Sequence, residues 1–125
     1  MSYKVTWEPR GVYCKFYGLV SVNETFVMLK QIYRDTRFAN LRYRIVDFVE
    51  VDRQQNSQSE INKVLAVNFA HDYSNSQRLS AYVLSNVDGE NGDLYPEHVN
   101  IFVNEADARE WLVENLFCRY YKSEC

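Results

Sequence analysis

The stretch LRYRIVDFVEVDRQQNSQSE, residues 41–60, decides the fold of this chain. Its first part, residues 41–48, ends in β-branched and aromatic residues that only Asp47 interrupts. A run of this kind is typical of an interior strand in a sheet that is covered on both faces. A polar loop follows, and an amphipathic helix starts near Glu60. In open α/β sheets, ligands and partners usually dock at the carboxyl edge, where such a strand gives way to a helix.

Two capping boxes mark the starts of helices. Ser21 and Ser57 are each followed three residues later by a glutamate, Glu24 and Glu60. In such a box the serine caps the helix and the glutamate reaches back to the cap amide. The first helix is expected to end near Arg34.

Apolar stripes after each cap predict which helix faces pack on the sheet. In the first helix the stripe is Val22, Phe26, Leu29 and Tyr33, widened by Met28 and Ile32. In the second helix, which is expected to end around Tyr73, the stripe is Ile61, Val64, Leu65 and Phe69.

Four further strands are predicted by short β-branched or alternating runs at residues 3–7, 12–17, 79–84 and 99–103. Pro9 and Gly11 form the turn of an N-terminal hairpin. Asn104 caps a last helix, whose inner face consists of Ala108, Trp111, Leu112 and Leu116. Strands alternating with helices predict an α/β fold with a five-stranded, mostly parallel sheet and helices on both faces. The N-terminal hairpin strand is expected to run antiparallel at the edge.

Length and charge narrow the class of protein. The 125 residues suit one domain, residues 1–125, with a single core. Acids and bases are interspersed at a net charge of −3, whereas nucleic-acid binders show a clustered basic face.

No apolar run approaches the ~20 residues of a membrane span, and the first residues do not form a signal region. A cytoplasmic protein without membrane insertion is therefore expected, and three cysteines do not make a disulfide framework.

Signatures of catalysis are missing from the sequence. It has no P-loop, no Gly-rich dinucleotide turn, no HExxH and no nucleophile elbow. Residues 88–93 resemble a calcium loop but do not match the EF-hand pattern. His71 and His98 are the only histidines, and nothing in the sequence marks a nucleophile beside either one. We therefore predict no catalytic residue, no metal and no cofactor.

Three polar residues of the opening stretch are candidates for a functional role. Asp47 lies within an apolar strand, and a buried carboxylate must be hydrogen-bonded or paired. It either fastens a neighbouring loop or cap or belongs to a site. Ser57 and Ser59 lie at the predicted start of the second helix, where serine ordinarily caps. A phosphate there would also be favourably placed against the helix dipole.

The chain resembles the SpoIIAA-like proteins, a STAS/SEC14-type group of small bacterial domains, over about residues 5–112. The similarity is carried by the order and spacing of Pro9-Arg10-Gly11, Gly18, IYRDTRF at residues 32–38, LRYRIVDF at residues 41–48 and AREWL at residues 108–112. The resemblance implies the fold of that family and a relation to the anti-sigma-factor antagonists. Those are non-enzymatic partners regulated by phosphorylation of a serine at the start of the second helix.

The position of that regulatory serine corresponds to Ser57 or Ser59. The antagonists carry an Asp-Ser-Ser-Gly-type motif there, whereas this chain reads NSQSE at residues 56–60, without glycine. The SEC14 side of the resemblance implies a lipid or another apolar ligand. Lipid-transfer domains of that type are about twice as long as this chain.

The leading hypothesis is a non-enzymatic interaction module that binds a protein partner at the carboxyl edge. This edge would comprise the loop at residues 49–59, the second helix and the loop at residues 86–98. The residues expected to bind the partner or to regulate binding are Asp47, Ser57, Ser59 and Glu60.

Two other hypotheses remain open. A small apolar ligand or lipid would bind in a cleft under the loop at residues 86–98, lined by Tyr82 and Tyr95. An unrecognised enzyme would use Asp47 with His71 or His98. The ten tyrosines and the edge strand also favour a homodimer.

Overall fold

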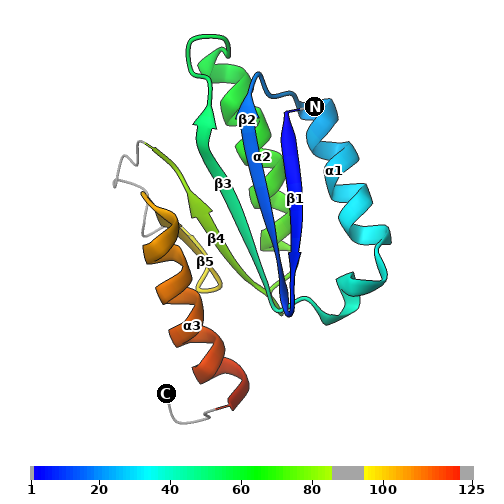
Figure 1. Cartoon of the computed structure of the whole chain (residues 1–125), viewed down its shortest axis with the longest axis vertical. Helices are drawn as coiled ribbons and strands as arrows, with labels where there is room; N and C mark the ends of the chain where they lie inside the picture. The colour runs from blue at the N-terminus through cyan, green and yellow to red at the C-terminus, as the bar shows by residue number, and fades with distance from the viewer. Residues whose placement is uncertain (1, 86–94, 122–125) are drawn as a thin grey trace.

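The structure, a computed structural model, describes residues 2–85 and 95–121. Its elements are β1 (Tyr3–Glu8), β2 (Gly11–Gly18), α1 (Val22–Arg34), the 3-10 helix η1 (Thr36–Asn40), β3 (Tyr43–Val51), α2 (Gln58–Tyr73), β4 (Leu79–Val83), β5 (Val99–Phe102) and α3 (Glu105–Tyr121). The five strands form one sheet in the order β1-β2-β3-β4-β5 (Figure 1). β1 runs antiparallel to β2, and every other neighbouring pair is parallel. The predicted α/β sheet with an antiparallel edge strand is confirmed.

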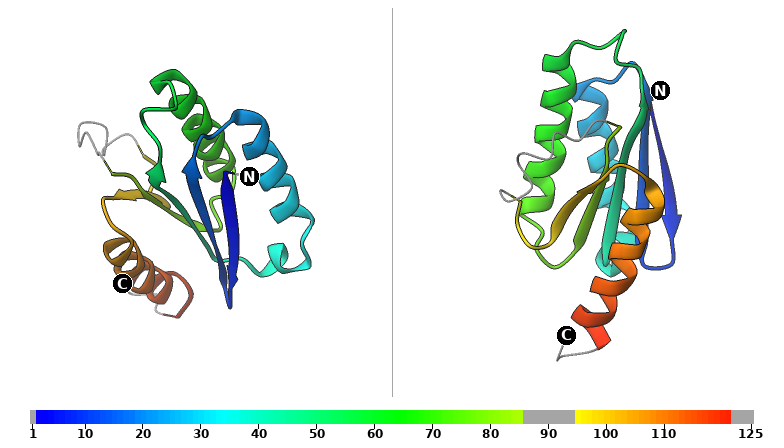
Figure 2. Two further views of the ribbon diagram at one scale, coloured as in Figure 1. Left: turned by 45° about the horizontal axis from the view of Figure 1, so that its top comes forward. Right: turned by 90° about the vertical axis from the view of Figure 1, so that its left-hand side faces the viewer.

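Helices cover the two faces of the sheet unequally. α1 and α2 lie on one face, and α3 lies on the other face against β4 and β5 (Figure 2). Because successive strand residues point to opposite faces, β3 contributes Val46 and Phe48 to the first core and Ile45 to the second. On the α3 side, no helix of the described residues lies over β1 and β2 (Figure 1).

The central strand is longer than its sequence predicts. β3 extends to Val51, whereas the apolar pattern ends at Phe48. Its last residues pair with the end of β2 after a register shift, with Glu50 opposite Tyr17 and Val51 opposite Gly18. The register shift places one extra residue in β3, and Val49 and Glu50 are both exposed. The sequence pattern of this segment therefore resembles a loop, although its pairing with β2 continues.

The predicted inner face of α1 is rotated. The buried residues are Thr25, Met28 and Ile32, whereas Phe26 and Tyr33 are exposed. Threonine is only weakly apolar, so Thr25 was not counted in the predicted stripe. The prediction instead centred the stripe on the larger aromatic residues. The helix end at Arg34 and the cap at Ser21 are confirmed.

The glutamates of both capping boxes also bind segments other than their own caps. Ser21 and Ser57 accept hydrogen bonds from the Glu24 and Glu60 amides, as predicted. The Glu24 carboxylate accepts from the amide and hydroxyl of Ser2, at 3.1 and 2.9 Å, and thereby ties α1 to the start of β1. The expected reach back to the cap amide is replaced by links between elements.

Two glycines are required by their surroundings. A Cβ at Gly11 would overlap the ring of Tyr43 on the neighbouring strand. Gly18 has a φ of 62°, which L side chains rarely adopt, and it turns the chain from β2 toward α1.

Among the described residues, no helix is long and apolar enough to cross a membrane.

Candidate functional site

The carboxyl edge of the sheet gathers the ends of the parallel strands and the starts of the helices. β2, β3, β4 and β5 all end at this edge, because they run parallel, and α1, α2 and α3 follow from it. It is the upper edge in Figure 1, where the arrowheads of β2 and β3 point. Backbone amides at helix starts lack intrahelical partners and attract negative charge.

Asn56 fastens the two loops at this edge. Its side-chain amide donates to the carbonyls of Gly18 and Asp52, at 2.8 and 2.6 Å, and its oxygen accepts from the Val20 amide at 3.0 Å. Asn56 is buried, and its bond to the Val20 amide is shielded from water. Sequence reasoning missed Asn56, because an asparagine in a polar loop carries no pattern that distinguishes it from its neighbours.

The predicted residues of α2 lie together at this edge. The Ser57 hydroxyl accepts from the Glu60 amide at 3.0 Å and caps α2. The Glu60 carboxylate accepts from the Val22 amide at 3.2 Å and ties the start of α2 to the start of α1. Ser59 is exposed and makes no hydrogen bond to another described side chain. Ser57 and Glu60 therefore have structural partners, whereas the exposed Ser59 has none among the described side chains.

Asp47 lies on the opposite face of the sheet from α2. Its carboxylate accepts from the Val49 amide at 2.9 Å and from the Tyr13 hydroxyl. Burial and the neighbouring Asp47 carboxylate raise the pKa of Tyr13, so the hydroxyl stays protonated and donates. The sequence predicted that this carboxylate must be hydrogen-bonded, and it is. The structure separates Asp47 from the residues at the start of α2.

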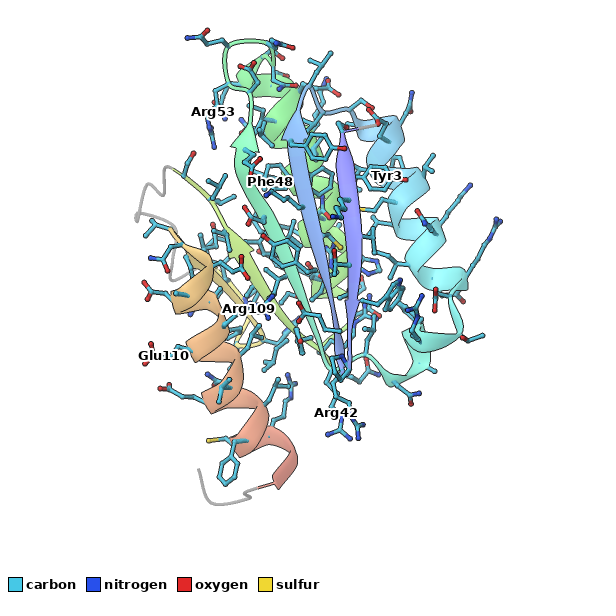
Figure 3. The ribbon with its side chains drawn as sticks, viewed as in Figure 1. Tyr3, Arg42, Phe48, Arg53, Arg109 and Glu110 are labelled. Atoms are coloured by element: carbon cyan, nitrogen blue, oxygen red, sulfur yellow. The ribbon has the colours of Figure 1, made fainter. Side chains whose placement is uncertain are left out.

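A second polar cluster fastens α3 to the hairpin. Arg109 donates to both oxygens of Glu8, at 3.1 and 2.7 Å, and to Glu105 at 2.7 Å. Its side chain reaches toward the sheet, whereas Glu110 points away (Figure 3). Tyr43 also donates to Glu8. The only sequence signal for this cluster is the spacing of four between Glu105 and Arg109, which predicts a helical pair but not the link to Glu8.

The two tyrosines of the ligand hypothesis flank one ring. Tyr82 and Tyr95 lie 4.5 and 5.6 Å from Phe69, between ring centroids. Tyr82 is fully buried, and its hydroxyl donates to Asp72. Tyr95 is half-buried. Tyr82 therefore has no surface on which a ligand could rest in this structure, and a binding role for Tyr95 stays a prediction.

Behind Tyr82 lies a buried ion pair. Arg44 donates to both carboxylate oxygens of Asp72, at 3.2 and 2.9 Å, and to the Asn68 side chain at 3.0 Å. Burial by itself would raise the pKa of Asp72, but the Arg44 guanidinium outweighs it and lowers the pKa. Cys14 lies in the same core, and burial raises the pKa of its thiol. These groups link α2 to β3 and are shielded from solvent.

The two histidines do not join Asp47. His71 accepts from Arg78 at 3.1 Å, and His98 donates to the Asp72 carbonyl at 2.8 Å. His98 also borders a cavity of about 470 Å³ near the start of β4, between Leu79 and Asn115. Both histidines thus lie near the amino edge of the sheet, away from Asp47. The described residues contain no group of His, Cys, Asp or Glu side chains that could hold a metal ion.

The predicted loop at residues 86–98 enters the description only from Tyr95 onward. Residues 86–94, including the predicted acidic segment at 88–93, lie outside the described residues.

Comparison with known proteins supports the fold. No family model matches the chain, and no curated protein matches it. A solved structure that matches is an uncharacterised protein from the DUF3478 family, with a SpoIIAA-like fold, from Shewanella loihica PV-4. The match has a TM-score of 0.52 at 15% identity and covers 88% of this chain and 91% of the other. The chain therefore has the SpoIIAA-like fold that the sequence resemblance implied.

Proposed function

We propose that this protein is a non-enzymatic, cytoplasmic interaction module that binds a protein partner at the carboxyl edge of its sheet. The observation that carries the proposal is the set of apolar side chains exposed there. Tyr17 and Leu19 lie at the end of β2, Val49 near the end of β3 and Val103 just after β5. Leu19 and Val103 are 58% and 56% exposed. Contiguous exposed apolar patches mark interaction sites, and we propose that these residues, at the ends of three parallel strands, form such a patch.

The polar groups at this edge support binding better than catalysis. Asn56 and Glu60 bind backbone groups of neighbouring segments and hold the loops at this edge in place, and Ser57 caps α2. A surface that is already ordered binds with a smaller entropy cost. Ser59 adds one exposed hydroxyl in the first turn of α2, and a phosphate there would meet the positive end of the helix dipole. We therefore assign partner binding to the apolar residues and a regulatory role to Ser59.

The test compares exposed apolar residues at the edge with one elsewhere. Affinity-tagged full-length protein with Leu19→Asp or Val49→Asp is expected to lose a partner that the wild type retains from its native cell. Val113→Asp is the matched control, because Val113 is 69% exposed on α3, away from this edge. Partner proteins are identified by mass spectrometry, and folding is checked by circular dichroism.

Two outcomes would contradict the proposal. One is a partner retained equally by the edge variants and by the Val113→Asp control. The other is the recovery of no partner by the wild-type protein at physiological salt.

A further inference from the structure

β1 is one of the two edge strands of the sheet. In the hairpin, Glu8 pairs with Gly11 across a two-residue turn, and the Tyr17 amide donates to the Ser2 carbonyl at 2.9 Å. Hydrogen-bonded pairs alternate along an antiparallel ladder, so the backbone groups of the even-numbered residues of β1 face β2. The amides and carbonyls of Tyr3, Val5 and Trp7 consequently point outward. Such an edge is a template for pairing with another strand.

The sequence of β1 complements itself around Thr6. If a second copy pairs antiparallel with Thr6 opposite Thr6, the outward-facing Val5 lies opposite Trp7 and Lys4 lies opposite Glu8. This register uses the outward backbone groups, because Val5 and Trp7 form its hydrogen-bonded pairs. Threonine pairs, aromatic with β-branched pairs and opposite-charge pairs are all favourable across strands. Because the two-fold axis passes through the Thr6 pair, the Val5–Trp7 pair and the Lys4–Glu8 pair each occur twice.

Charge supports the same register. Lys4 is exposed and has no ion pair or hydrogen bond among the described residues. Glu8 belongs to a cluster in which Arg109 is shared with Glu105. The neighbouring Asp47 adds a third carboxylate, which Tyr13 links to Glu105. Lys15, which interacts with Asp47 and Glu105, adds a second cation and brings its own partner carboxylate, Glu50. The ammonium of a partner's Lys4 would therefore meet net negative charge.

The helix beside β1 enlarges the contact. Gln31 of α1 accepts from the Tyr3 hydroxyl at 3.4 Å, so this flank of α1 lies next to the edge strand. Val27, one turn earlier on the same flank, is 57% exposed. A two-fold axis along the sheet normal leaves both copies of α1 on the same face, side by side. The interface then includes a helix flank as well as strand pairing.

From these observations we infer that two copies of this chain pair through β1, in a register that centres on Thr6, and form one continuous ten-stranded sheet. The number of strands follows from two sheets of five. This surface is distinct from the carboxyl edge, so the dimer does not depend on the proposed function.

Cysteine cross-linking tests the register. Thr6 faces its own copy in a non-hydrogen-bonded pair, whose Cα atoms are about 4.5 Å apart, within the range of a disulfide. Thr6→Cys is expected to yield an intermolecular disulfide under mild oxidation. Lys4→Cys is the matched control, because the two Lys4 residues would lie about 13 Å apart along the strands. Both variants are made with Cys118→Ser and Cys125→Ser, so that a cross-link reports the introduced thiol.

Light scattering after gel filtration tests the dimer itself. The wild type is expected to elute at twice 14.8 kDa. Lys4→Glu would place like charges opposite Glu8 twice and is expected to weaken the dimer about tenfold. Lys63→Glu, the same charge change on exposed α2, is expected to leave it unchanged.

A mass of 14.8 kDa at every concentration, with no cross-link at Thr6, would overturn the inference. A dimer that cross-links through Val5→Cys rather than Thr6→Cys would overturn the register. Loss of the dimer in Leu19→Asp or Val49→Asp would place the interface at the carboxyl edge instead, and would also overturn it.

Discussion

At the scale of single residues, the molecule depends on polar groups that are buried and paired. Arg44 and Asp72 are both shielded from solvent and form a bidentate ion pair between β3 and α2. A charge left alone in such a place is far more costly than the pair is favourable. The pair therefore fixes how α2 sits on the sheet.

Asp72→Asn tests this pair. The substitution keeps the shape of the side chain but leaves the Arg44 charge uncompensated, so the free energy of unfolding should fall by about 3–5 kcal/mol. Urea denaturation measures the change. Glu110→Gln, on the exposed face of α3, is the control and should change stability by less than about 0.5 kcal/mol. A loss as small as that of the control would contradict a buried, unscreened pair.

His71 makes the stability of the fold depend on pH. Burial and the Arg44 guanidinium lower the pKa of His71 from 6.5 to about 4. Between these values the unfolded chain binds a proton that the folded chain does not, so stability is expected to fall as pH drops from about 6.5 to about 4. His71→Gln keeps an acceptor for Arg78 and removes the titration. Thermal melts across this range should show a smaller slope for the variant, and equal slopes would refute the assignment.

At the scale of elements, the faces of the helices decide what is core and what is surface. The centre of the buried face of α1 lies at Met28, whereas Phe26 is half exposed. An apolar stripe gives the period of a helix, but the size of a side chain does not say which side of the stripe meets the sheet.

Alanine substitutions on α1 distinguish the two faces. Met28→Ala is expected to cost about 2–5 kcal/mol, as a large-to-small change in a core does. Phe26→Ala should cost less than about 1 kcal/mol, since half of this ring already faces water. Denaturation midpoints measured under the same conditions give both values. A larger loss for Phe26→Ala would restore the face that the stripe predicted.

The two serines at the start of α2 differ in their contacts. Ser57 caps the helix, whereas Ser59 has no described side-chain partner. Ser57→Ala removes the acceptor of the Glu60 amide and should destabilise the protein by about 1 kcal/mol. Ser59→Ala removes an exposed hydroxyl with no described side-chain partner and should leave stability unchanged. The two variants form a matched pair in urea denaturation. Equal losses would mean that Ser59 has a structural role and would weaken its assignment to regulation.

At the scale of the whole molecule, the two proposals place binding at different edges of the sheet. The carboxyl edge carries the exposed apolar residues, and β1 presents unpaired backbone groups at right angles to it. The two proposals can therefore be tested on one protein without interfering with each other.

Dimerisation through β1 also predicts how stability depends on concentration. Association that only the folded chain can make stabilises it by mass action, so the Tm of the wild type should rise with protein concentration. Lys4→Glu should reduce this dependence, and Lys63→Glu should preserve it. Differential scanning calorimetry over a range of concentrations measures the effect. A Tm independent of concentration would argue against the dimer.

Much of the architecture could be predicted from local patterns. The capping serines Ser21 and Ser57 and the apolar run before Val49 are enough for the element order, the parallel sheet and the covering of both faces. These features depend on residues close together in the chain, whereas the SpoIIAA-like fold was implied by the family resemblance and is supported by the similar solved structure.

The opening stretch itself shows where that reasoning ends. The sequence determined that residues 41–60 form a central strand, a loop and a capped helix, because hydrophobic periodicity and capping act over a few neighbouring residues. Only the tertiary structure decided that Asp47 faces α3 while Glu60 binds the start of α1, and that Asn56 joins the loops after β2 and β3. Such partners lie 30 or more positions apart in the chain, and their pairing depends on strand order and register, which no local pattern encodes.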